Sequence, residues 1–217
     1  MRQTSTMHLL LATVCALLLT SVVVCSVEIQ PTRPLLPKTD IRSPFIANHT
    51  KLLMELMETN FDYSLSYLFS SKQYGSQYIE RPGMSKFLME ASDKHWKEGF
   101  DVLQKFLQRG GNFDDVSLSV KGKGYHNLTV TGGSGENYVN TLEDVLENCQ
   151  GRYEQMNKLC HKANKSPSSS GDAEIAHYLE EKLEDEAKRL RELYGHIVTL
   201  KKMKSLGVAL NMFDSNL

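Results

Sequence analysis

The chain has 217 residues, a formal net charge of −1 at pH 7 and a hydrophobic content of 41%. This length suits one domain with a tail. The nearly balanced charge argues against a basic nucleic-acid-binding surface and against an acidic interaction tail. We therefore expect no nucleic-acid partner.

The N-terminus has the pattern of a secretory signal. Arg2 supplies a positive charge, residues 9–24 form an apolar run, and small residues suited to cleavage follow near Cys25 and Ser26. The run is shorter than the ~20 residues that a membrane-spanning helix needs. We therefore favour a cleaved signal over residues 1–26 rather than a membrane anchor, and expect a secreted protein with no membrane contact after cleavage.

Three Asn-x-Ser/Thr triplets follow, and behind a signal peptide they become candidate glycosylation sites. They begin at Asn48, Asn127 and Asn164. Pro167 comes directly after the third triplet, which makes Asn164 the poorest acceptor of the three.

Outside the signal, the cysteines do not indicate a disulfide framework. Cys149 and Cys160 are eleven residues apart on one expected helix, which separates them by about 16 Å along the axis. That distance is too long for a bond within the helix, although either thiol could pair with another chain.

Beyond the signal, residues 27–44 form a proline-rich arm that is expected to be extended. Residues 45–217 then form the folded domain, with helices expected at about 45–71, 82–109, 136–164 and 172–205 and one further small helix in the tail. Pro82 suits a helix start, Gly110-Gly111 suits a helix end, and residues 166–171 read as a linker.

The lengths of the connections predict the topology. Short links make the first and second helices antiparallel neighbours, and likewise the third and fourth. The connection 112–135 can reach roughly 80 Å when extended, whereas a helix of about 27 residues is ~40 Å long. We therefore expect an all-α four-helix bundle, up-down-down-up, with one long crossover. Alternating residues in that link indicate an extended crossover, with a small hairpin as the alternative.

Each long helix interrupts or flanks its apolar stripe with residues of metal-ligand type. A charge on a buried stripe is costly unless it is paired or bound to metal, and facing helices with glutamates and a Glu-x-x-His pair build di-iron sites in bundles. Taken singly, each has a simpler explanation: a half-exposed glutamate, a hydrogen-bonded histidine or a small buried thiol. The set is Glu55, Asp62, His95, Glu98, Cys149 and Glu186.

Four segments carry a resemblance to ferritin subunits. They are LMELMETNFDYSLSYLF at 53–69, LQKFLQRGG at 103–111, the long helix 179–203 and MFD at 212–214. Together with the signal and the triplets, they most resemble the secreted ferritins of arthropods, over residues 45–217. The resemblance implies a ferritin-like bundle with a short fifth helix in a shell of twenty-four subunits. Ferrous iron would enter this shell and be stored in its cavity as a ferric mineral. The resemblance implies no organic cofactor.

The resemblance also implies where an iron-oxidising centre would lie and how this chain departs from it. Glu55 is retained, but the tyrosine of the site falls on Asp62, the bridging glutamate on His95, the histidine on Glu98, the third-helix glutamate on Cys149 and the fourth-helix polar residue on Glu186.

These departures oppose paired-iron chemistry, because two iron ions need bridging carboxylates and the neighbouring Lys94 brings positive charge. The resemblance therefore implies a light-type subunit that relies on heavy-type partners for oxidation. One ion held by Glu55, Glu98 and Glu186, with His95 beside them, stays open, as does a buried ion-pair network. A rearranged ferroxidase and a secreted helical carrier or signalling protein without a shell are the competing functions.

Three further carboxylates follow from the resemblance. Glu90 and Asp93 are candidates for collecting iron on the inner surface, and Glu180 for a channel. An ordinary solvated face explains Glu90 and Asp93 equally well, because lysines lie nearby.

Overall fold

The structure is a computed structural model that describes residues 42–116, 135–165, 171–203 and 206–217. The signal region, most of the expected arm, Asn127 and the alternating segments of the crossover lie outside the described residues. The described elements are helical: α2 (Pro44–Tyr74), α3 (Pro82–Gln108), the short turn η1 (Phe113–Asp115), α4 (Gly135–Ala163), α5 (Ala173–Lys202) and α6 (Leu206–Asp214).

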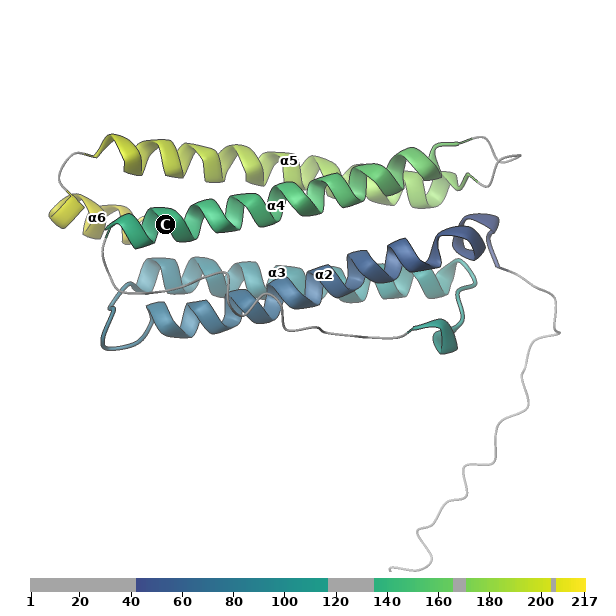
Figure 1. Cartoon of the computed structure of the whole chain (residues 1–217), viewed down its shortest axis with the longest axis horizontal. Helices are drawn as coiled ribbons and strands as arrows, with labels where there is room; N and C mark the ends of the chain where they lie inside the picture. The colour runs from purple at the N-terminus through teal and green to yellow at the C-terminus, as the bar shows by residue number, and fades with distance from the viewer. Residues whose placement is uncertain (1–41, 117–134, 166–170, 204–205) are drawn as a thin grey trace, which may run out of the picture. The chain divides into compact units, whose positions relative to one another are not determined.

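The four long helices form two antiparallel pairs, α2 with α3 and α4 with α5 (Figure 1). Helices α3 and α4 run in the same direction, so the end of α3 and the start of α4 lie at opposite ends of the bundle (Figure 1). This confirms the predicted all-α bundle with a short C-terminal helix. The observed helix ends lie within three residues of the predicted ones.

Local sequence accounts for where the helices begin and end. Pro82 occupies the first turn of α3, where its missing N–H costs nothing. The Asp172 carboxylate caps α5 by accepting hydrogen bonds from the main-chain N–H groups of Glu174 and Ile175. After α3, Gly110 adopts a φ of 83°, a left-handed conformation that glycine enters without steric cost.

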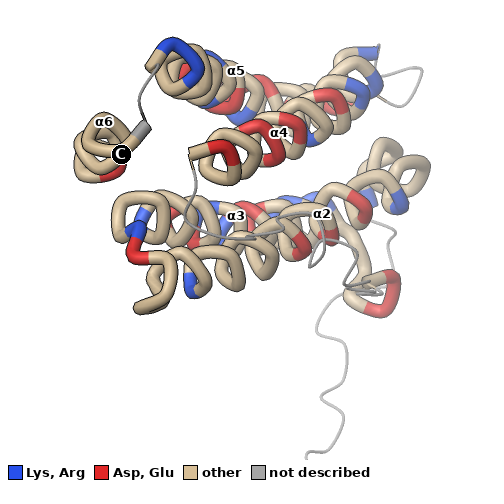
Figure 2. Tube along the Cα trace, turned by 60° about the vertical axis from the view of Figure 1, so that its left-hand side comes forward, with Lys and Arg blue, Asp and Glu red and all other residues tan. Residues whose placement is uncertain are grey.

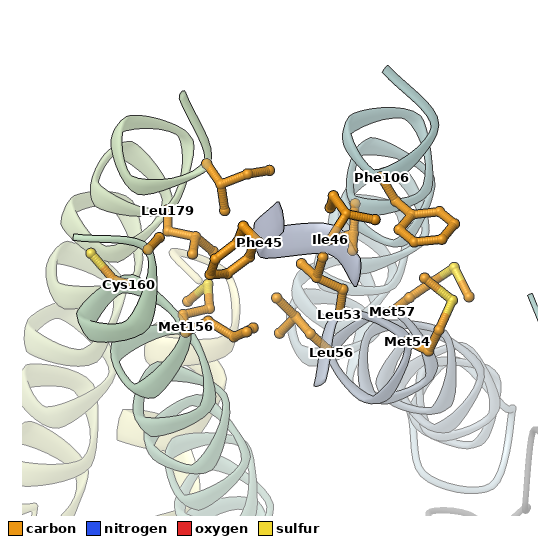
Figure 3. Close-up of a cluster of buried hydrophobic side chains, with 14 of the residues drawn as sticks. Phe45, Ile46, Leu53, Met54, Leu56, Met57, Phe106, Met156, Cys160 and Leu179 are labelled. Atoms are coloured by element: carbon orange, nitrogen blue, oxygen red, sulfur yellow. The ribbon is translucent and has the colours of Figure 1, made fainter. Parts of the chain in front are cut away.

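The interior contains two apolar clusters, one toward each end of the bundle. The first gathers Phe45, Leu56 and Phe106 with Met156 and Leu179 (Figure 3). The second is built around Tyr67, Leu88, Leu142, Cys149 and Leu193. On each long helix the residues of the two clusters are separated along the chain, and the polar residues described below lie between them.

Helices α2 and α3 approach closely because small residues face each other. The Ser92 hydroxyl donates to the main-chain carbonyl of Ser64 at 2.8 Å, and a Cβ at Gly99 would lie 2.8 Å from the Phe61 ring. None of the described helices combines the length and apolarity needed to cross a bilayer.

Candidate functional site

An arginine lies at the centre of the polar band between the two apolar clusters. Arg152 is only 2% exposed. It lies three residues after Cys149 and four before Met156, so all three share the inward face of α4. Arginine is almost never fully buried unless it is paired. Its partners therefore define the centre of the bundle.

Arg152 is paired with carboxylates from two other helices. Its guanidinium forms close ion pairs with Glu98 of α3 and Glu186 of α5. The Nε–H group of Arg152 also donates to Glu186 Oε1 at 3.3 Å. Its Nη1 donates to the side-chain oxygen of Asn60, on α2, at 3.0 Å. One cation thus joins all four long helices, and the planar fork of arginine suits this multiple contact.

The two carboxylates favour the charged form of Arg152. Burial alone lowers the pKa of Arg152, but the two carboxylates outweigh burial and raise that pKa above its usual value. A guanidinium is in any case not deprotonated in proteins. The cluster therefore contains a permanent positive charge with Glu98 and Glu186 against it.

His95 completes the cluster as a neutral ring. Burial, followed by the charges of Arg152, Arg189 and Lys94, holds the pKa of His95 well below its usual value. Its Nδ1 lies 3.1 Å from the Asn60 side-chain oxygen, and Arg189 NH1 lies 3.4 Å from its Nε2. A neutral ring donates from one nitrogen and accepts at the other, so the proton belongs on Nδ1.

Asn60 orients these groups. Its amide nitrogen donates to the main-chain carbonyl of Leu56 at 2.9 Å, which turns the amide oxygen toward Arg152 and His95. Sequence reasoning did not select Asn60, because a single buried amide on a helix carries no pattern.

Two further cations border the cluster. Lys94 Nζ lies 3.8 Å from Glu98 Oε1, and together with Arg189 it lines an open hollow of about 320 Å³ between α3 and α5. Figure 2 shows residues of both charge signs along these two helices. On the other side, Tyr178 and Lys182 line a cavity of about 10 Å³ beside Arg152, which is space for roughly one water molecule.

The structure brings three of the sequence-selected residues together. His95, Glu98 and Glu186 are 0%, 6% and 0% exposed, and all three belong to the Arg152 cluster. Cys149, at 1% exposure, lies on the same face of α4. Burial, with a further contribution from Glu186, raises the pKa of the Cys149 thiol to about 12.

Glu55 and Asp62 are not part of the cluster. The Glu55 side chain is 47% exposed and lies 3.9 Å from Lys51, so an interior ion shared with Glu98 and Glu186 does not include it. Asp62 is partly buried, and its Oδ1 has no hydrogen-bond partner among the described residues. Burial and then Glu58 raise the pKa of Asp62.

The other selected residues lie on the surface. Glu90 and Asp93 are exposed, and Glu90 lies 3.9 Å from Lys86. Glu180 is exposed and accepts a hydrogen bond from Asn164 at 3.1 Å. Asn48 is exposed on α2, where its amide donates to the Pro44 carbonyl at 2.9 Å.

Cys149 and Cys160 are both buried, free thiols.

Two of the carboxylates selected from the sequence contact an arginine. A two-metal centre needs carboxylates that bridge both ions, whereas the carboxylates of Glu98 and Glu186 both contact the guanidinium of Arg152. Among the described residues, no three His, Cys, Asp or Glu side chains form a metal-binding group.

Arg152, like Asn60, was not selected from the sequence. Its spacing from Cys149 and Met156 places it on the apolar stripe of α4, and this could have revealed it. Arginine is normally expected to be solvated, so its type argues against an inward position even where the spacing favours one.

Comparisons with known proteins support the same fold. The sequence matches the family of the ferritin-like domain over residues 50–203. It is 29% identical to a ferritin light chain of Trichoplusia ni, over 78% of this chain and 76% of that protein. It is also 29% identical to a ferritin heavy chain of Aedes aegypti, over 72% of each chain. The structure resembles the crystal structure of Trichoplusia ni secreted ferritin with a TM-score of 0.67 at 24% identity, covering 84% of this chain and 89% of that one.

Proposed function

The chain belongs to the ferritin family, and we propose that it is an iron-storage subunit of the light type, without an iron-oxidising centre of its own. The observation that carries the proposal is the buried Arg152 between Glu98 and Glu186. The guanidinium brings fixed positive charge to the region where the family's paired iron ions would lie, and like charges repel most strongly where water is excluded.

The changed ligand types support the same conclusion. An imidazole at His95 cannot bridge two ions as a carboxylate does, and the Cys149 thiol, with its raised pKa of about 12, stays protonated at neutral pH. A protonated thiol is a poor metal ligand, because metals bind the thiolate. The polar band therefore lacks the negative charge that two ferrous ions would require.

We propose further that the subunit assembles with heavy-type subunits in a secreted shell of twenty-four. The similarity to one light chain and one heavy chain from insects supports this, as does the fold shared with a secreted ferritin. The heavy-type partners would oxidise iron, and the mineral would form in the common cavity. Glu90 and Asp93 would collect iron there, and Glu180 would lie near an entry channel.

The test is iron oxidation by the isolated chain. Protein produced from residue 27 onward is mixed with ferrous iron under air, and ferric absorbance is followed by stopped flow. We expect a rate no faster than buffer for this chain alone and a faster rate once a heavy-type subunit is added. A saturating oxidation phase from this chain alone would refute the light-type assignment.

A rearranged ferroxidase is the second candidate, and the proximity of His95 and Glu98 in the bundle interior favours it. If it were correct, Glu98→Ala would abolish any oxidation seen with the isolated chain. Light scattering addresses the shell separately: a stable monomer under all conditions, with or without a heavy-type partner, would point to a carrier or signalling protein.

A further inference from the structure

The Arg152 guanidinium is enclosed by the atom types that bind a divalent cation. Carboxylate oxygens reach it from Glu98 on α3 and Glu186 on α5, and an amide oxygen reaches it from Asn60 on α2. The His95 ring contacts the same amide oxygen at 3.1 Å. Oxygen and imidazole donors on separate helices are a common ligand set for divalent metals.

These donors exist in a fixed arrangement because Arg152 holds them. Glu98, Glu186 and His95 are each at most 6% exposed. Removing the guanidinium would take away the ion-pair partner of Glu186 and leave Glu98 with only Lys94, at 3.8 Å, as a cationic partner among the described residues. Buried carboxylates in that condition must take up protons or bind another cation. The cavity beside them, about 10 Å³, has no room for an ion and its waters while the arginine is present.

We propose that Arg152 stands in the place of a divalent metal ion, and that it is the residue that keeps the bundle interior free of metal. Loss of its side chain would turn the enclosure into a single-ion site formed by Glu98, Glu186 and Asn60, which His95 joins through Nδ1 once its proton has moved from Nδ1 to Nε2. The inference deepens the proposed light-type role, but it concerns one ion rather than an oxidising pair.

Two cations at the border set the strength of that site. Lys94 lies 3.8 Å from Glu98 Oε1, and Arg189 lies 3.4 Å from His95 Nε2. Lys94 would compete with the ion for Glu98, and Arg189 would oppose the proton shift to Nε2 that frees Nδ1 for the ion. Adding Lys94→Ala to the Arg152 variant should therefore tighten metal binding.

The experiment titrates Co²⁺ into wild type, Arg152→Ala and Arg152→Lys, following binding by calorimetry and the visible Co²⁺ spectrum. We expect one additional Co²⁺ per subunit in Arg152→Ala, bound at least tenfold more tightly than any site of the wild type. Arg152→Lys keeps the positive charge and should behave like the wild type. The variant Arg152→Ala/Glu98→Gln/Glu186→Gln, which lacks the carboxylates, should lose the additional site.

The result that overturns the inference is a folded Arg152→Ala protein with the Co²⁺ stoichiometry and spectrum of the wild type. If Arg152→Ala does not fold in metal-free buffer, Co²⁺ or Zn²⁺ should restore its helical circular dichroism, whereas the variant without carboxylates should fold without metal. Failure of the metal to restore folding also overturns it. Neither readout involves iron oxidation or shell assembly, so this failure is distinct from failure of the proposed function.

Discussion

Asp214, near the end of the chain, caps the first turn of α3 by accepting hydrogen bonds from the main-chain N–H groups of Gly83 at 3.0 Å and Met84 at 2.9 Å. The same carboxylate accepts from the Tyr138 hydroxyl at 3.0 Å. A helix N-terminus has unpaired N–H groups and a partial positive charge. One carboxylate of α6 therefore pairs two main-chain N–H groups at the start of α3 and links α3 to α4.

This contact requires glycine at position 83. A Cβ there would overlap the main-chain carbonyl of Asp214, so Gly83→Ala should push α6 away and destabilise the protein by about 1–3 kcal/mol. Asp214→Ala should cost about 1–2 kcal/mol through the lost cap. Urea unfolding at one fixed protein concentration measures both changes.

Gly195→Ala is the matched control for that pair. Gly195 lies within α5, and a Cβ there meets no atom within 4 Å, so alanine should stabilise the protein by up to about 1 kcal/mol through helix propensity. If Gly83→Ala gave the same gain as Gly195→Ala, the close approach of Asp214 to α3 would be wrong.

At the opposite end of the bundle, Asp172 should make stability depend on pH. The Ser43 hydroxyl donates to Asp172 at 2.6 Å, and Arg109 NH2 donates to it at 2.8 Å. Burial raises the pKa of Asp172, but the hydrogen bonds from Ser43, Arg109 and the Ile175 N–H outweigh burial and hold that pKa below 3.8. Because the folded-state pKa is depressed, the stabilisation is present above pH 4 and is lost as the pH falls through the folded value.

Asp172→Asn tests this dependence. We expect this variant to lose about 1–2 kcal/mol of unfolding free energy at pH 7. The difference in unfolding free energy between wild type and variant should narrow as the pH is lowered from 4 toward 2. Chemical denaturation at several pH values measures the gap. A gap that stayed constant over this range would show that the charge of Asp172 makes no contribution.

The sequence predicted most of the fold, because long apolar stripes, glycine stops and unequal link lengths leave few arrangements of four helices. It also placed His95, Glu98 and Glu186 correctly on inward faces. The line Met84, Leu88, Ala91, His95, Glu98 and Val102 is buried throughout, and its regular spacing of three and four residues is why reasoning from α3 succeeded.

The α2 residues show where this reasoning fails. The inward stripe of a helix is about 100° wide, so residues at its edge can turn either way. Glu55 lies at that edge and points to solvent with Lys51, whereas Asn60 lies inside at 1% exposure. The spacing of Arg152 places it on the inward stripe of α4, but its partners could not be predicted from α4 alone, since the carboxylates come from α3 and α5.

Both described thiols should be unreactive in the folded protein. Burial raises the pKa of Cys149 to about 12, and Cys160 is 6% exposed with its pKa raised by burial and Glu180. Only the thiolate attacks a disulfide reagent, so in protein produced from residue 27 a colorimetric disulfide should react over hours at pH 8. In guanidinium chloride both thiols should react at once. Reaction of the native protein within minutes would contradict the burial of these residues.

Replacing Arg152 alone should lower the free energy of unfolding strongly, whereas replacing it together with Glu98 and Glu186 should lower it much less. Arg152→Met removes the ion-pair partner of buried Glu186 and leaves Glu98 with only Lys94 as a cationic partner in the described part of the chain. This should cost roughly 3–5 kcal/mol of unfolding free energy in a buffer containing a chelator. Arg152→Met/Glu98→Gln/Glu186→Gln has neither charge to compensate and should recover most of that loss, because exchanging a whole buried ion cluster for neutral groups is often nearly neutral. Denaturant unfolding of the wild type, Arg152→Met, Glu98→Gln/Glu186→Gln and the triple variant gives the coupling free energy between Arg152 and the two glutamates. A single variant within 0.5 kcal/mol of the wild type, the usual range for a surface substitution, would show that the guanidinium is solvated and that the cluster does not exist.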